Sequence, residues 1–120
     1  MNRETRQRIL SLCPEYHNIS NYLYQKRDGI TRRLISEYQE FVFSVDIDDY
    51  EDKKKLLSFN KVMEEYISNH KFAQALRNYL KAIPSDLKKM PSKELIQSIL
   101  DFKQKYEDEA LKQISITKWL

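Results

Sequence analysis

The chain has 120 residues, of which 41% are hydrophobic and 32% are charged, and its 21 Lys and Arg against 18 Asp and Glu give a net charge of +3. Its one glycine excludes the glycine-rich loops of dinucleotide-binding and P-loop folds, and leaves few sites for the tight turns of an all-β protein. These numbers predict one domain over residues 1–120 with an all-α fold. We expect a compact bundle of five or six helices whose short connections are capped by Pro, Ser and Asp.

The first helix is predicted over residues 2–12, where helix-forming residues dominate. Pro14 then favours the start of a second helix, which should end near Asp28. Gly29 is expected to stop this helix in the left-handed conformation. On that basis Gly29→Ala should destabilise the fold.

The third helix is predicted from about Thr31 to Val45 by apolar residues at spacings of three and four. Residues 41–47 also alternate between apolar and polar, which is the pattern of a strand. No second alternating run offers it a partner. A helix that leaves in an extended segment is therefore favoured over a strand.

The second half of the chain begins with an acidic turn at residues 46–49, which suits the start of a helix. Asn69 is expected to end that helix in the left-handed conformation, although it and the next helix could also form one long bent helix. Ser92 is expected to cap the last helix, whose apolar stripe runs from Leu95 to Ile114. The expected helices cover residues 49–69, 71–83 and 86–90 and a long segment from 92.

The location of the protein is predicted from its cysteine and its apolar runs. Cys13 is the only cysteine, so no intramolecular disulfide can form, which is typical of a reducing compartment. The polar N-terminus has no signal-peptide pattern, and no apolar run approaches the ~20 residues of a membrane span. We expect a cytoplasmic protein without a membrane segment.

Residues suited to catalysis or metal binding are few. Cys13 and His17 could form a nucleophile and base, but Pro14 between them breaks their register on a common helix. One cysteine and two histidines do not supply a zinc site. The acidic run 46–52 lacks both the third ligand and the glycine of a calcium loop. The sequence therefore predicts no catalytic residue, metal or cofactor, and a protein that is not an enzyme.

A basic segment covers residues 70–93, which contain six basic residues and one acidic residue, Asp86. Such a segment suits nucleic-acid phosphates or an acidic protein surface, and equally a solvated helix face. The small net charge of the whole chain argues against a dedicated nucleic-acid binder. The basic residues are Lys71, Arg77, Lys81, Lys88, Lys89 and Lys93.

Tyrosine is in excess, with eight residues that cannot all be buried in a small bundle. Tyr22, Tyr24 and Tyr50 are candidate contacts for a protein partner, as is Trp119 near the C-terminus, because amphipathic aromatic residues are favoured at interfaces. The sequence favours a non-enzymatic adaptor, inhibitor or regulator that binds a protein partner. The alternative is an accessory subunit that contacts nucleic acid through residues 70–93, and the oligomeric state is left open.

Overall fold

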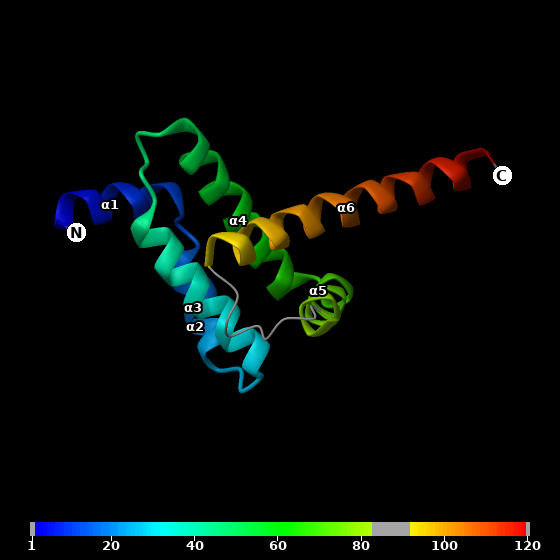
Figure 1. Ribbon diagram of the computed structural model, residues 1–120, viewed down its shortest axis with the longest axis horizontal. Helices are drawn as coiled ribbons and strands as arrows, with labels where there is room; N and C mark the ends of the chain where they lie inside the picture. Colours follow the sequence, from blue (N-terminus) through cyan, green and yellow to red (C-terminus); the bar gives the residue numbers. More distant parts are fainter. Residues whose placement is uncertain (1, 83–91, 120) are drawn as a thin grey trace.

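The structure, a computed structural model, describes residues 2–82 and 92–119, with the side chains of the last helix as far as Lys112. Within these residues the chain forms six α-helices and no strand (Figure 1). The all-α bundle is therefore confirmed, whereas the expected helix 86–90 lies outside the described residues. The helices are α1 (Arg3–Leu12), α2 (Tyr16–Tyr24), α3 (Gly29–Ser44), α4 (Tyr50–Ser68), α5 (His70–Ala82) and α6 (Ser92–Trp119).

Side chains cap the starts of several helices. The first N–H groups of a helix have no partner inside it, so a preceding Asn or Asp side chain satisfies them. Asn2 accepts from the N–H of Thr5 at 2.7 Å, at the start of α1. Asp49 accepts from the N–H of Asp52 at 3.1 Å, at the start of α4. The cap predicted in the acidic turn is thus confirmed.

Gly29 does not have the role that the sequence predicted. It is the first residue of α3, and α2 already ends at Tyr24, before the expected Asp28. Asp28 accepts from the N–H of Ile30 at 3.2 Å and so starts α3. No described residue has a positive φ, so the prediction of a left-handed Gly29 is wrong. Gly29 therefore begins α3 behind the Asp28 cap, and it does not end α2.

Asn69 also differs from the prediction, because its backbone is extended, with φ −121° and ψ 102°. It ends α4, and its Oδ1 accepts from the N–H of Phe72 at 3.2 Å, which starts α5. The two helices therefore meet at a one-residue corner and are not one bent helix. At the other ambiguous segment, α3 continues to Ser44 and Val45 is extended, which confirms the favoured helix with an extended exit.

The core receives side chains from every helix. The apolar stripes seen in the sequence face inward except on the outer part of α6, where Ala110 is exposed and the side chain of Ile114 lies outside the described residues. Tyr38 and Phe59 are the largest fully buried aromatic side chains from α3 and α4. Tyr79 of α5 stacks on Phe102 of α6 with ring centroids 4.8 Å apart. Side chains that are 0% exposed are Ile9, Leu23, Leu34, Tyr38, Val42, Leu56, Phe59, Val62, Met63, Phe72, Leu76, Leu95 and Ile99.

Helix α6 extends beyond the bundle (Figure 1). Its 28 residues span about 42 Å. Leu95 and Ile99 near its start are fully buried, but every residue from 107 to 112 is exposed. The molecule measures 56 × 31 × 25 Å, and its radius of gyration of 15.5 Å exceeds the roughly 13.6 Å of a compact chain of this length. Among the described helices, none is both long enough and apolar enough to span a membrane.

Candidate interaction surfaces

Cys13 lies in the core and is 1% exposed. Burial raises the pKa of its thiol to about 11, and the nearby carboxylates of Glu15 and Glu64 add to the rise. The thiol is therefore protonated at neutral pH, whereas a nucleophile needs the thiolate. His17 is exposed, with its ring edge-on to Tyr16 at 5.3 Å. This geometry gives no support to a Cys–His pair.

A polar cluster that the sequence did not predict joins three parts of the chain. Asn60 donates through Nδ2 to Glu15 Oε2 at 3.1 Å and to Glu64 Oε1 at 3.0 Å. The buried Tyr38 hydroxyl donates to Asn60 Oδ1 at 2.5 Å. Burial and the neighbouring Glu15 raise the pKa of Glu64. A buried polar network with its partners in place fixes one arrangement of the helices, so we assign this cluster a structural role.

A metal site needs several His, Cys, Asp or Glu side chains close together. Over residues 2–82 and 92–112, no group of three or more His, Cys, Asp and Glu side chains is placed to hold a metal ion. The acidic turn between α3 and α4 instead uses its carboxylates on its own backbone. Asp46 Oδ1 accepts from the N–H of Asp48 at 3.0 Å, and Asp52 Oδ2 accepts from the N–H of Asp46 at 3.1 Å.

The three candidate tyrosines are exposed but do not share one surface. Tyr24 is 67% exposed, and its hydroxyl donates to Gln39 Oε1 on α3 at 3.4 Å. The ring of Tyr22 lies under the ammonium group of Lys26 at 4.7 Å. Tyr50 begins α4, at the opposite end of α3 from the α2–α3 connector (Figure 1). The side chain of Trp119 lies outside the described residues.

The basic residues of segment 70–93 are also spread over the molecule. Lys71, Arg77 and Lys81 lie on α5, whereas Lys93 lies on the first turn of α6, where it lines a groove with residues of α3 and α4. Figure 1 shows the start of α6 well apart from α5. Arg77 donates to Gln74 Oε1 at 2.8 Å and lies beside the Tyr66 hydroxyl, so part of its role is structural. Lys88 and Lys89 lie outside the described residues.

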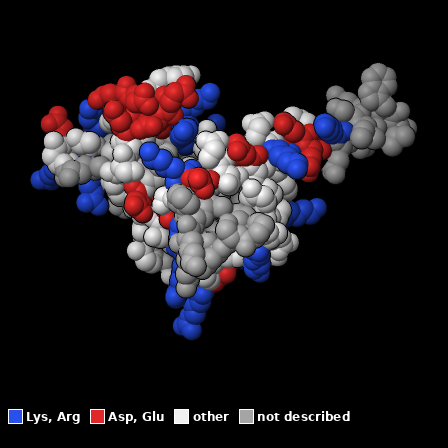
Figure 2. Space-filling view, in the orientation of Figure 1, with Lys and Arg blue, Asp and Glu red and all other residues white. Residues whose placement is uncertain are grey.

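The two ends of α3 differ in charge, although basic side chains also adjoin the acidic end (Figure 2). Acidic side chains gather around the α3–α4 turn, at the top of the view, and basic side chains gather at the bottom. The basic end includes Lys26, Arg27 and Arg32, which are exposed on and beside the α2–α3 connector. The acidic end contains Asp46, Asp48, Asp49, Glu51 and Asp52.

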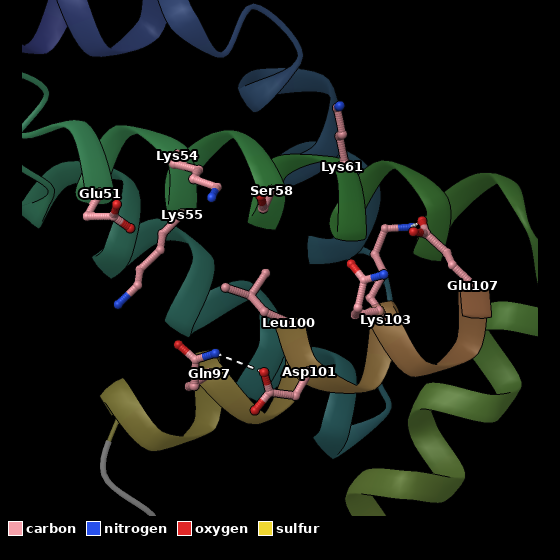
Figure 3. A pocket seen from close by; sticks show the side chains of 11 residues that line it. Glu51, Lys54, Lys55, Ser58, Lys61, Gln97, Leu100, Asp101, Lys103 and Glu107 are labelled. Atoms are coloured by element: carbon pink, nitrogen blue, oxygen red, sulfur yellow. Dashed lines mark hydrogen bonds and ion pairs between the residues drawn. The ribbon is translucent and has the colours of Figure 1, made fainter. Parts of the chain in front are cut away.

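A groove of about 480 Å³ runs between α4 and α6 (Figure 3). Leu100 lies inside it, Lys54 and Lys55 approach from α4, and Asp101 lies on α6. Gln97 donates to Asp101 Oδ1 at 2.9 Å, which holds this carboxylate on the α6 wall. The groove therefore has a basic wall on α4 and a more acidic wall on α6.

Lys103 closes one end of this groove. Its ammonium group pairs with Glu65 and with Glu107, the latter at 2.7 Å, and lies 5.3 Å from the centre of the Phe72 ring. One turn beyond Glu107, Leu111 is 62% exposed. Residues four apart share a helix face, so Leu111 continues the side of α6 that carries Glu107. The exposed residues 107–112 are called here the α6 extension.

Comparison of the chain with protein-family models, curated proteins and solved structures finds no match.

Proposed function

We propose that this chain is a non-enzymatic interaction protein that binds a protein partner through the α4–α6 groove and the α6 extension. The observation that carries the proposal is the exposure of the α6 extension, including 62% of Leu111, on a helix whose first turns are buried in the bundle. A helical stretch without a packed face is marginal in water. A partner that covers this face would stabilise it.

The charges of the groove indicate the chemistry of the partner. Lys54 and Lys55 line the groove on α4 and Asp101 lines it on α6, while the α6 extension begins with three acidic residues, Glu107, Asp108 and Glu109. These walls suit an amphipathic helix with acidic residues on one edge and basic residues on the other. Charged rims of this kind orient a partner and increase the rate of association.

The affinity would come from apolar contacts along the same line. Leu100 is half-buried in the groove, and Leu111 is largely exposed beyond it. Full burial of a leucine side chain contributes about 1.5–3 kcal/mol, and Leu111 still has more than half of its surface to bury. An apolar stripe on the partner helix that covers both leucines would supply the central contacts.

The alternative, an accessory subunit that contacts nucleic acid through residues 70–93, has less support. Its described basic residues lie on two separate parts of the molecule, with Lys93 on α6 and the others on α5. The helical spacing also puts Lys71 and Arg77 about 120° apart around α5. These side chains do not make a continuous phosphate-binding strip.

Affinity capture with purified tagged protein tests the proposal. We expect the wild type to capture a partner from nuclease-treated extract of the native cells, and Leu111→Glu to reduce capture at least tenfold because it places a charge in the apolar contact. Leu57→Glu is the matched control, since Leu57 is 39% exposed on α4 and does not line the groove.

Two results would reject the proposal: equal capture by Leu111→Glu and wild type, or loss of capture after nuclease treatment. If the partner is a second copy of this chain, sedimentation velocity of the purified protein shows its oligomeric state. In that case the wild type is a dimer and Leu111→Glu is a monomer.

A further inference from the structure

The α2–α3 connector carries a second surface, which shares no residue with the α4–α6 groove or the α6 extension. It combines an exposed aromatic ring with three exposed cations. We propose that this connector surface binds single-stranded nucleic acid, with Tyr24 stacking on a base and the cations contacting phosphates. The connector surface consists of Tyr24, Lys26, Arg27, Arg32, Ser36 and Gln39.

The first argument is the position of the Tyr24 ring. Tyr24 is 67% exposed, and its hydroxyl donates to Gln39 Oε1 at 3.4 Å, which orients the ring along the α3 surface. A ring that is already ordered loses little side-chain entropy when a ligand stacks on it. Stacking on an aromatic side chain is the main way in which proteins bind unpaired bases.

The second argument is the groove beside this ring. It has a volume of about 360 Å³, which lies within the range of small-ligand sites, and it is bordered by Leu23 and Ile35 as well as by Tyr24. Arg32, Ser36 and Gln39 supply polar groups along its edge. Because Leu23 and Ile35 are buried, the Tyr24 ring is the apolar surface that this groove offers to the face of a planar heterocycle. The polar groups along the edge of the groove can hydrogen-bond to the edge of that heterocycle.

The third argument is the local charge. Lys26, Arg27 and Arg32 are exposed, with the Lys26 ammonium group over the Tyr22 ring, and the carboxylate within this segment, Asp28, caps α3. Arg33 is not counted among the phosphate contacts, because it forms an ion pair with Glu37 at 3.0 Å. Figure 2 shows blue side chains at this end of the molecule, away from the acidic α3–α4 turn.

The geometry favours a single strand over a duplex. A base can stack on Tyr24 only if its face is free, which is the case in single strands and loops and not inside a double helix. Stacking accepts every base because each has a π-face, so we expect little sequence preference. An acidic protein segment would also satisfy the cations, and the dependence of binding on Tyr24 and on a nucleic-acid ligand distinguishes the two.

Fluorescence anisotropy with labelled single-stranded dT and rU oligonucleotides tests the proposal. Three phosphate contacts predict that log affinity falls with log salt concentration with a slope of about −2, or roughly a 20-fold loss between 50 and 200 mM salt. Tyr24→Ala should weaken binding about tenfold, because one stacking contact is lost. Tyr24→Phe keeps the ring and should bind within about twofold of wild type.

A pair of charge variants locates the site. The triple variant Lys26→Glu, Arg27→Glu, Arg32→Glu should abolish binding. The control triple Lys71→Glu, Lys81→Glu, Lys105→Glu changes the net charge by the same amount at exposed positions on α5 and α6 and should leave most of the affinity. Circular dichroism checks that both triples remain helical, and the Tyr24 variants decide the question if either does not.

Several outcomes would overturn the proposal. These are no binding of single strands at 50 mM salt, an equal loss in the two triple variants, and no effect of Tyr24→Ala. Tight binding of an acidic peptide of equal length would also overturn it, if the peptide binds as tightly as the oligonucleotide and its binding does not depend on Tyr24. That result would identify an acidic protein segment as the ligand.

Discussion

Cys13 is a buried thiol whose proton is held by its surroundings. Burial removes a thiolate from water, and the carboxylates of Glu15 and Glu64 repel its charge, so the pKa of Cys13 rises from its ordinary 9.0 to about 11. The neutral thiol is compatible with the core, whereas the thiolate is not. A group whose pKa is higher in the folded chain than in the unfolded chain stabilises the fold below its unfolded pKa. That stabilisation disappears as the pH rises towards its folded pKa.

We therefore expect the free energy of unfolding to fall between about pH 9 and pH 11. The stability lost through Cys13 by pH 10.5 is on the order of 2 kcal/mol. Urea denaturation at pH 8 and pH 10.5 measures it, with Cys13→Ala as the control that lacks the titrating group. Tyr38, whose pKa burial also raises, adds a loss above pH 10 in both proteins. A pH-dependent loss of the same size in both proteins would contradict the assignment to Cys13.

At the scale of single residues, the sequence predicts which side chains are buried better than it predicts their hydrogen-bond partners. The spacing of Leu56, Phe59 and Met63 correctly predicted the inner face of α4. Asn60 falls on the same face, and a polar residue there signals a buried hydrogen-bond network. Its partner Glu15 lies 45 residues away in the chain, so only the packing of α2 against α4 identifies it.

At the scale of elements, the start of α3 allows a direct test. Gly29 has no positive φ, and a Cβ placed on it meets no atom within 4 Å. Alanine loses less conformational freedom on folding than glycine, so Gly29→Ala should stabilise the protein by about 0.5–1 kcal/mol. Urea denaturation of wild type and variant measures this difference. A destabilised variant would show that the backbone here is not helical.

The sequence predicted that these segments are helices, but it did not predict all of their ends, because some residues favour two different helix boundaries. Asp28-Gly29 carries two competing signals, since the glycine can stop a helix in the left-handed conformation and the aspartate can cap the next one. The cap prevails in the structure. Asn69 had the same ambiguity, and again its side chain caps the following helix. Short polar residues next to a break are better interpreted first as N-caps of the next helix.

At the scale of the whole molecule, the α6 extension determines the shape. We expect X-ray scattering of the monomer to give a maximum dimension above 50 Å, since the longest axis of the structure is 56 Å. Leu111→Glu should give the same curve, because Leu111 is already largely exposed. A maximum dimension near that of the bundle alone would mean that α6 folds back, and would remove the basis of the proposed partner surface.

The arrangement of charge is also a property of the whole molecule. The composition correctly indicated a near-neutral chain, but not that α3, about 24 Å long, separates an acidic end from a basic end. The candidate tyrosines also lie at opposite ends of this helix, because Tyr24 precedes its start and Tyr50 follows its end. The sequence showed the acidic turn itself, but not that α3 places it at the opposite end of the helix from Lys26, Arg27 and Arg32.

The absence of left-handed backbone in the described residues has a consequence for mutational tolerance. In most proteins some exposed positions accept only glycine, so a saturation-mutagenesis map mixes conformational requirements with functional ones. Here that source of intolerance is missing over residues 2–82 and 92–119. An exposed position in these segments that rejects most substitutions would therefore report a contact made by its side chain. In such a map, intolerance at Tyr24 or Leu111 would point directly to binding.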